Sequence, residues 1–428
     1  MGHTVNPDRE YRLLQQRLDR HITGAPDSPV FMKILRLLFS PEDAQMARQI
    51  PTRPISLNGL SRKLNIPREE LGDKMTDMAE RGLVIDIVFE NKRYFSLAPV
   101  VIGFFEFTFM RTRDDFPMAE LAHLFDQYMG QDDRFARAVF AGETQIGRSL
   151  VREESLPESD HTEILDWERA SHIVESASEA GVSLCACRHK ASHLGKACDK
   201  PQEVCLSLNF AAETLIRSGL ARSISIDEAM RILEFAKEAG LAQTGDNVQR
   251  NVGYICNCCG CCCGMIEAIK SFDIRNAIVT SNWIMEVDLE KCTGCGKCAD
   301  ACPLDIIEIV MEGEGKGKKK WAIRDETLCL GCGVCYSSCK FGAITMKPRD
   351  RRVFTPETTF DRLVAMAIER GKLAELLFED PRRLSHRALG RIVGILEKTP
   401  PYKAAMAVKP LRSAFFNTVV GAVGGMLK

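Results

Sequence analysis

Cysteine is the residue of this sequence whose number and spacing point most directly to chemistry. All 18 cysteines lie between Cys185 and Cys339. Eight of them form two copies of the spacing C-x2-C-x2-C-x3-C: Cys292, Cys295, Cys298 and Cys302, followed by Pro303, and then Cys329, Cys332, Cys335 and Cys339. Three thiolates on one tight loop can wrap three irons of a cubane cluster, while the fourth cysteine opens a helix that leads away. Glycines between the cysteines let the backbone approach such a cluster closely.

This doubled run resembles the bacterial two-cluster ferredoxin, in which the fourth cysteine of each run serves the other cluster. The resemblance implies two [4Fe–4S] clusters, one held by Cys292, Cys295, Cys298 and Cys339, and the other by Cys329, Cys332, Cys335 and Cys302. Short strands are expected around the runs, at residues 283–288, 306–311, 321–324 and 343–346. Zinc sites use paired CxxC knuckles, which this doubled run does not match.

Two departures from the ferredoxin pattern are visible. Lys340 replaces the proline expected after the second run, which affects only the local turn. Residues 312–320 form an insert with four lysines, which we expect to be an exposed hairpin loop. A solvated loop is favoured for these lysines over contact with an acidic partner.

The ten other cysteines form two further groups. The first is Cys185, Cys187, Cys198 and Cys205, and the second is Cys256, Cys258, Cys259, Cys261, Cys262 and Cys263. So many thiols without a metal would repel one another once ionised and would oxidise readily, so we expect one or two further iron–sulfur clusters. The first group alone can complete a cubane, and Arg188, His189 and Lys190 beside it would supply positive charge and hydrogen-bond donors.

The consecutive cysteines at 258–259 and 261–263 cannot all face one centre, because adjacent side chains diverge. Three arrangements are open: some of the six complete a cluster with the first group, some hold a second cluster, and some are free redox thiols. Between the two groups, Ser225 is expected to cap a helix over residues 226–239.

The rest of the composition is that of an ordinary globular chain. Of 428 residues, 57 are Lys or Arg, 58 are Asp or Glu, and 45% are hydrophobic, which excludes wholesale disorder. The N-terminus lacks the apolar region of a secretory signal. The longest apolar run, residues 97–110, contains Glu106 and is shorter than the roughly 20 residues of a spanning helix. We therefore expect a cytoplasmic protein, in which cysteines stay reduced and bind metal rather than form disulfides.

We expect an α+β multidomain fold with a winged helix-turn-helix, a helical cysteine-rich domain, a two-cluster ferredoxin-like domain and C-terminal helices. The expected segments are 1–29 (helix and linker), 30–110 (winged-helix-like), 111–180 (helical connector), 181–275 (cysteine-rich, cluster-binding), 276–349 (ferredoxin) and 350–428 (basic helical tail). Residues 30–98 read as three helices and a hairpin, the order of a winged helix. Its third helix, residues 67–82, holds three basic and five acidic residues. Phosphate contacts require the opposite balance, so docking or dimerisation is favoured over DNA binding.

The C-terminal residues 381–428 hold nine basic residues and one acidic residue. We expect an amphipathic segment that docks on an acidic protein surface or makes a peripheral contact with an anionic membrane, with the first favoured.

The combination of these segments resembles 4Fe–4S ferredoxin-type proteins of anaerobic bacteria and archaea, over residues 30–347. The resemblance implies an electron-transfer protein or oxidoreductase subunit that relays single electrons through its clusters to a redox partner or oxidoreductase complex. No phosphate-binding loop and no nucleophile–base motif indicates an autonomous enzyme. Two alternatives are a redox-sensing winged-helix transcription regulator and a reductase that uses the cysteines at 256–263.

Overall fold

The computed structural model describes residues 7–157, 164–312, 319–378 and 384–402, and the chain divides into two compact units. The first unit comprises Met1–Thr144, Ser218–Leu220 and Thr359–Lys428. The second comprises Gln145–Arg217 and Ala221–Thr358, and it holds all 18 cysteines. No helix in the described ranges is long and apolar enough to cross a membrane.

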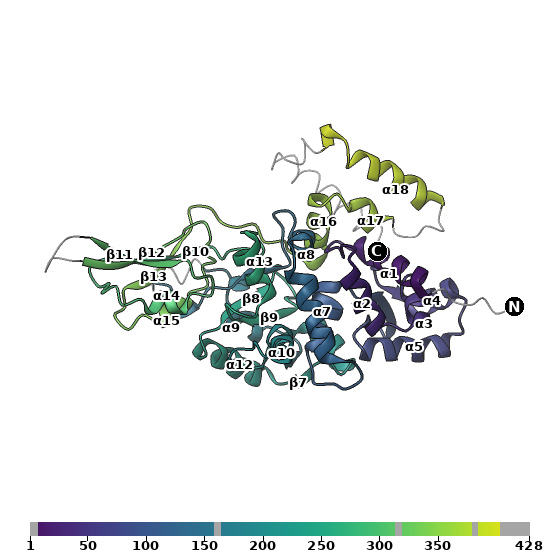
Figure 1. Ribbon diagram of the computed structural model, residues 1–428, viewed down its shortest axis with the longest axis horizontal. Coiled ribbons are helices and arrows are strands. Elements are labelled where there is room, and N and C mark those ends of the chain that lie inside the picture. The colour runs from purple at the N-terminus through teal and green to yellow at the C-terminus, as the bar shows by residue number, and fades with distance from the viewer. Residues whose placement is uncertain (1–6, 158–163, 313–318, 379–383, 403–428) are drawn as a thin grey trace. The chain divides into compact units, whose positions relative to one another are not determined.

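The N-terminal part of the first unit consists of helices and a small antiparallel sheet of order β1-β3-β2. Its elements are α1 (Pro7–Asp19), α2 (Pro29–Leu38), α3 (Pro41–Ala47), β1 (Ile55–Ser56), α4 (Leu57–Leu64), α5 (Arg68–Glu80), β2 (Val84–Phe89) and β3 (Lys92–Leu97) (Figure 1). Ser56 caps α4 by accepting a hydrogen bond from the Gly59 N–H. The β2–β3 turn contains Glu90 and Asn91, both with positive φ, which fits a tight hairpin.

The remaining regular elements of the first unit are helices. They are α6 (Phe105–Phe109), α7 (Met118–Gly130), α8 (Arg134–Val139), α16 (Thr359–Glu369), α17 (Leu373–Leu377) and α18 (Leu384–Leu396). The segment before α6, Val100–Phe104, is kinked, with non-helical backbone angles at Val101, Ile102 and Gly103. Stacked and tilted aromatic rings form the core, among them Phe31 on Tyr128 and Phe104 near Phe125. Of the expected apolar face of the tail, Ile392 and Leu396 are exposed. Residues 403–428, the rest of the basic tail, lie outside the described ranges.

A six-stranded sheet of order β4-β8-β9-β6-β5-β7, antiparallel throughout, is the centre of the second unit. Its strands are β4 (Gly147–Ser149), β5 (Ala180–Leu184), β6 (Glu203–Leu208), β7 (Arg222–Ile224), β8 (Ala242–Asp246) and β9 (Tyr254–Cys258). The accompanying helices are α9 (Ala170–Glu175), α10 (Ala186–His193), α11 (Asn209–Arg217), α12 (Ile226–Glu238) and α13 (Gly264–Phe272). The expectation of a helical cysteine-rich domain is therefore wrong, since five of these strands lie in residues 180–258.

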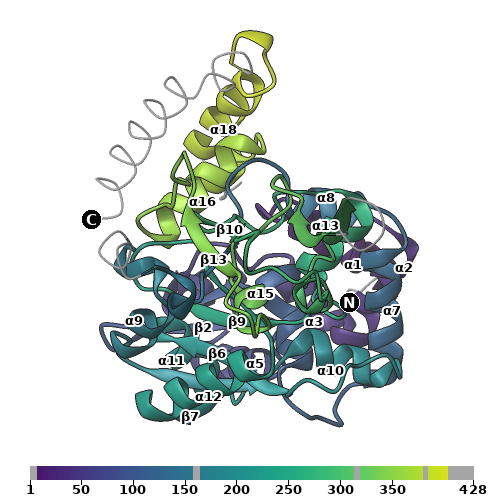
Figure 2. The same ribbon diagram turned by 90° about the vertical axis from the view of Figure 1, so that its left-hand side faces the viewer.

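Strand alternation gives this sheet one strongly apolar face. Val182, Leu206 and Ile255 point to the same side and pack with residues of α9 and α12, which lie side by side (Figure 2). Ser225 caps α12 by accepting a hydrogen bond from the Glu228 N–H, as the sequence predicts.

A smaller lobe of the second unit, residues 283–348, carries the doubled cysteine run. Strand β10 (Trp283–Val287) pairs antiparallel with β13 (Ile344–Pro348), and β11 (Ile307–Glu312) with β12 (Lys319–Arg324) (Figure 1). The third cysteine of each run lies in a short helix, Cys298 in α14 (Lys297–Ala301) and Cys335 in α15 (Val334–Ser337). The fourth cysteine therefore follows a helix and does not open one, contrary to the expectation from the sequence. These strands lie where the sequence predicts them. Residues 313–318 of the lysine-rich insert lie outside the described ranges.

Candidate metal centres

Two cavities in the 283–348 lobe each collect four cysteines. The first is lined by Cys292, Cys295, Cys298 and Cys339. The second is lined by Cys329, Cys332, Cys335 and Cys302. Each cavity thus takes three cysteines from one run and the last cysteine of the other run. This is the grouping that the ferredoxin resemblance implies.

Glycine is required in both cysteine loops because the backbone passes too close to its neighbours for a side chain. Gly294 has φ +64°, and a Cβ there would overlap the Cβ of Lys320 on β12. Gly331 has φ +70°, and a Cβ there would overlap the carbonyl oxygen of Trp283 on β10. The left-handed conformation and the close approach both exclude other residues. The strands therefore fix the positions of the two loops.

The lining of each cavity fits an iron–sulfur cluster. Apolar side chains line both cavities beside the cysteines. Ile309 and Ile344 are among those of the first cavity, and Met285 and Met346 are among those of the second. Burial raises the pKa of Cys332 in the second cavity to about 12, so this cysteine favours the neutral thiol unless a cation holds its thiolate. Backbone amides face the sulfurs as well: the Ala343 N–H donates to Cys339 Sγ at 3.4 Å. Such N–H···S bonds are typical around clusters.

The two cavities differ in charge and exposure. Arg324 lines the second cavity. The guanidinium of Arg349 donates a hydrogen bond to the carbonyl oxygen of Cys329 at 2.5 Å. The backbone N–H of the buried Arg152 donates to the carbonyl oxygen of Cys332 at 3.2 Å. The first cavity has Lys297, whose side chain is 69% exposed, and its Cys295 is exposed too. The second cavity has the more positive surroundings, and none of its cysteines is exposed.

Arg152 also connects the second cavity to the end of α12 and to the residue before β8. Its guanidinium donates to the hydroxyl of Ser337, to the carbonyl of Lys237 at 2.8 Å and to that of Leu241 at 3.2 Å. Sequence reasoning missed Arg152 and Arg349. The sequence carries no signal for Arg152, which precedes Cys332 by 180 residues.

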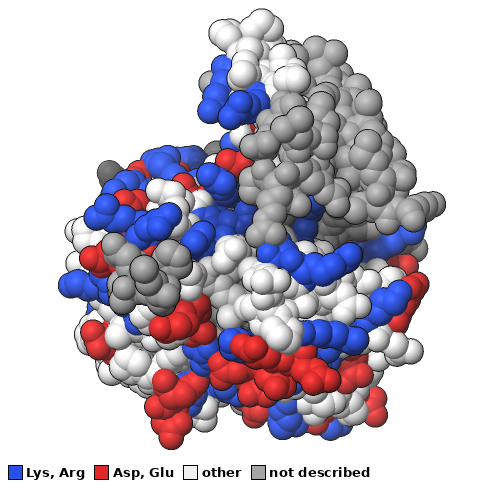
Figure 3. Space-filling model, turned by 90° about the vertical axis from the view of Figure 1, so that its right-hand side faces the viewer, with Lys and Arg blue, Asp and Glu red and all other residues white. Residues whose placement is uncertain are grey.

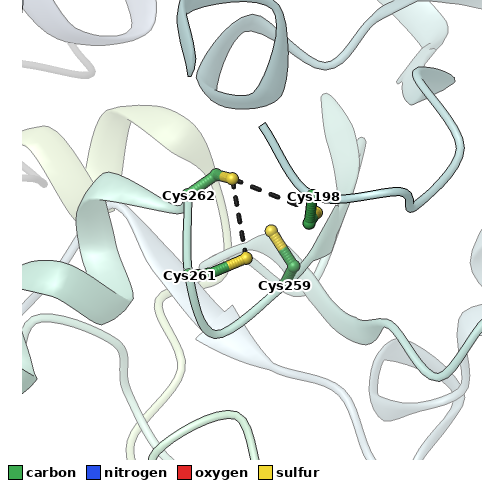
Figure 4. Close-up of side chains that lie close together, drawn as sticks. All are labelled: Cys198, Cys259, Cys261 and Cys262. Carbon is green, nitrogen blue, oxygen red and sulfur yellow. Dashed lines mark hydrogen bonds between the residues drawn. The ribbon is translucent and has the colours of Figure 1, made fainter. Parts of the chain in front are cut away.

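The other ten cysteines fall into two groups. In the four-sulfur group, the Sγ atoms of Cys198, Cys259, Cys261 and Cys262 all lie within 4.8 Å of one another (Figure 4). The six-thiol group is connected by thiol–thiol interactions among Cys185, Cys187, Cys205, Cys256, Cys258 and Cys263. Within it, the Sγ atoms of Cys263 and Cys258 are 3.4 Å apart.

Strand register explains this division. Leu206 of β6 lies opposite Ile255 of β9, so Cys256 and Cys258 share the face of Cys205, away from the apolar face. Cys259 follows the strand and packs with apolar residues of the other side, Val204, Ala236 and Leu241. The structure therefore separates Cys198 from the other three members of its sequence group. The four-sulfur group takes one cysteine from the first sequence group and three from the second.

Arg188 is a fully buried guanidinium among these sulfurs. It donates to the carbonyl oxygens of Pro201 at 3.0 Å and of Asn257 at 3.0 Å. Burial acts to lower its pKa, but the neighbouring sulfurs of Cys185 and Cys259 raise the pKa above its usual range. A buried cation needs an anionic partner, and the pKa of Cys259, which is lowered in part by Arg188, favours the thiolate there. The position of Arg188 beside Cys187 in the sequence predicts this role.

Thiolate character is strongest at Cys259. Hydrogen bonding from Cys262 and then from Arg188 lowers the pKa of Cys259 to about 4, against the effect of burial. Hydrogen bonding from Cys256 lowers the pKa of Cys258 to about 6. Each group therefore contains a cysteine whose surroundings favour the thiolate, the form of cysteine that binds metals.

The turn that carries the four-sulfur group touches the 283–348 lobe. A Cβ on Gly260 would lie 2.5 Å from the carbonyl oxygen of Pro303, the residue after Cys302. Lys270 joins the two segments, since its Nζ lies 3.4 Å from the Gly260 carbonyl oxygen and 2.5 Å from Asp305 Oδ2. The four-sulfur group is thus next to the second cavity.

Comparison with known proteins supports the assignment of the lobe. Residues 291–343 match the family model of a 4Fe–4S dicluster domain. A segment of 51 residues is 39% identical to one component of the Na⁺-translocating ferredoxin:NAD⁺ oxidoreductase complex of Acetobacterium woodii, over 12% of this chain and 15% of that component. The chain therefore covers a small part of this relative. No solved structure matches. These similarities support 4Fe–4S cluster binding and iron–sulfur electron transfer.

Proposed function

We propose that this chain relays single electrons through two [4Fe–4S] clusters in the 283–348 lobe. The observation that carries the proposal is that each of the two cavities is lined by four cysteines, with the fourth exchanged between the runs. The proposed ligands are Cys292, Cys295, Cys298 and Cys339 for the first cluster, and Cys329, Cys332, Cys335 and Cys302 for the second. A [4Fe–4S] cluster takes up and releases one electron at a time.

The chain's own residues provide what electron transfer requires. The cysteine loops fix the cluster positions, and the apolar linings exclude water. Backbone amides such as that of Ala343 and cations such as Arg152 stabilise the more negative, reduced state. Because the second cavity has the more positive surroundings, its cluster is expected to have the higher potential of the two.

The surface of the lobe suggests where electrons enter. Cys295 is exposed at the first cavity, and Phe341, which also lines it, is 53% exposed. A redox partner can approach the first cluster there, while the second lies deeper. We propose an oxidoreductase or an oxidoreductase complex as the partner, as the similarity to a component of such a complex suggests.

We propose a winged-helix fold for β1, α4, α5 and the β2–β3 hairpin, with a docking role. The exposed side chains of α5 comprise five acidic residues, Glu69, Glu70, Asp73, Asp77 and Glu80, against Arg68 and Lys74. Seen from the side on which α5 lies in Figure 1, acidic side chains gather in the lower half of the surface (Figure 3). This charge favours a protein partner over DNA. Salt-sensitive binding to a DNA fragment that changes with cluster oxidation would contradict this role.

The exchange of cysteines gives a direct test. In anaerobically purified protein, Cys339→Ser is expected to lose about four irons with four sulfides and the signal of the first cluster, although it alters the second run. Cys302→Ser is expected to lose about four irons with four sulfides and the signal of the second cluster, although it alters the first run. Ser338→Ala, beside Cys339, is the matched control and should retain both. Iron and sulfide assays with electron paramagnetic resonance of the reduced protein measure the outcome, and loss that follows the mutated run would refute the ligand assignment.

A further inference from the structure

The four-sulfur group differs in geometry from the two cluster cavities. All four Sγ atoms lie within 4.8 Å of one another, with Cys261 and Cys262 3.6 Å apart and Cys262 and Cys198 4.0 Å apart. Figure 4 shows Cys259, Cys261 and Cys262 on one turn, and Cys198 on a separate segment facing them. Two segments distant in the sequence thus bring their thiols to one point.

These separations match the thiolates of a single ion. Zinc binds cysteine sulfur at about 2.3 Å, and a tetrahedron of that radius places its sulfurs about 3.8 Å apart. In a cubane each cysteine binds a different iron at a corner of the cube, so the four ligand sulfurs stand roughly 6 Å apart. The observed Sγ–Sγ separations of 3.6 and 4.0 Å are close to the separation of about 3.8 Å around a single ion.

We propose that Cys198, Cys259, Cys261 and Cys262 bind one metal ion, zinc or iron, in a mononuclear tetrathiolate site distinct from the iron–sulfur clusters. Tetrahedral coordination by four sulfurs selects these metals over the hard cations, which prefer oxygen ligands. The site lies beside the second cluster cavity because Gly260, in the middle of the turn, touches Pro303.

The surroundings of the group complete such a site. Val204, Ala236 and Leu241 form an apolar wall against Cys259. The backbone amide of Cys262 faces the Cys259 sulfur, and that of Cys198 faces the Cys262 sulfur. Four thiolates around a divalent ion leave a net charge of −2, and Arg188, which interacts with Cys259, compensates part of it.

The thiol of Cys263, the residue after the turn, points away from the proposed single-ion site. Cys263 follows Cys262 directly, but its sulfur lies 3.4 Å from that of Cys258, in the six-thiol group. Cys262 and Cys263 are therefore adjacent residues of the same type that belong to different sites. They form a matched pair for mutation.

The test uses the full chain, purified anaerobically after growth with zinc or with cobalt, with metals and sulfide counted per chain. We expect one ion per chain that is not accompanied by inorganic sulfide. This ion is expected to be zinc after growth with zinc and cobalt after growth with cobalt. The cobalt form should show the intense d–d absorption of a tetrahedral thiolate complex. Where the single ion is iron, one-electron oxidation by added ferricyanide converts it to the ferric state, whose high-spin resonance the clusters do not give.

The variants locate the ion. Cys262→Ser should lose it while cluster iron and sulfide stay unchanged, and Cys263→Ser should retain it. Cys198→Ser, on the other segment, repeats the first result if Cys262→Ser does not fold. Loss of about four irons with four sulfides in Cys262→Ser would overturn the proposal in favour of a further cubane. A wild-type chain with no additional ion, or with a disulfide between Cys261 and Cys262, would also overturn it.

Discussion

Gly294 and Gly296 permit a sharp test of how the first cysteine loop is positioned. Both lie in one loop of the first cavity and both are left-handed, with φ +64° and +82°. They differ in the space around them. A Cβ on Gly294 would overlap the Lys320 side chain and lie 2.9 Å from its backbone carbon, whereas the nearest atom to a Cβ on Gly296 is 4.0 Å away.

The expected costs follow from these contacts. Either glycine changed to alanine loses about 1–2 kcal/mol for a left-handed residue with a side chain. Gly294→Ala adds about 1–3 kcal/mol for forcing apart two packed segments. Because every 1.4 kcal/mol is tenfold in an equilibrium, the first cluster should be lost from Gly294→Ala roughly 5- to 150-fold more readily than from Gly296→Ala.

Anaerobic titration of each variant with an iron chelator measures this ratio, with electron paramagnetic resonance to distinguish the clusters. The second cluster should stay in place in both variants, because Gly294 contacts β12 at the first cavity. Equal loss of the first cluster from the two variants would refute the argument, since only the conformational strain would then matter. Loss of the second cluster instead would refute the assignment of the loop.

Three further predictions concern buried charges. Arg152→Met should lower the reduction potential of the second cluster, as measured by redox titration. Arg152→Lys, which preserves the positive charge, should leave this potential close to that of the unmutated protein. Arg188→Met should destabilise the second unit by about 3 kcal/mol in urea unfolding, because the mutation removes the buried cation beside the sulfurs. It should also weaken retention of the single ion. An unchanged midpoint of urea unfolding would contradict this prediction. Burial raises the pKa of Glu106 to about 7, above its ordinary value of 4.5, so the fold favours the protonated acid and loses stability as pH rises from 4.5 through 7. Glu106→Gln should therefore stabilise the chain at pH 8 by up to about 3 kcal/mol, with no gain below pH 4.5 in thermal unfolding across pH.

The elements around the doubled run were predictable because glycine, proline and cysteine spacing determine local structure there. The β2–β3 hairpin and α12 were predictable for similar reasons, namely a tight turn between two β-rich runs and a capping serine before an amphipathic stretch. These signals are local, so a single sequence contains them.

The cysteine-rich sheet was not predictable in the same way. Segments 180–184 and 203–208 alternate Gly, Ser or Cys with apolar residues, but segment 254–258 has Asn257 between two cysteines. The cysteines of the last two segments indicate ligands more strongly than they indicate a strand pattern. The division of these cysteines into two groups depends on which strands pair and in which register. That pairing joins β6 to β9 across about 50 residues, a separation at which a local pattern carries no information.

The exchange of Cys302 and Cys339 between the two cavities also bears on how such a lobe can originate. A peptide with only one run would place three cysteines around its own cavity and point its fourth outward. It would close a four-cysteine site only by pairing with a second copy that offered its fourth cysteine in return. A chain that carries both runs makes that pairing intramolecular, and the two halves can then differ locally, as Lys340 at the position that corresponds to Pro303 shows.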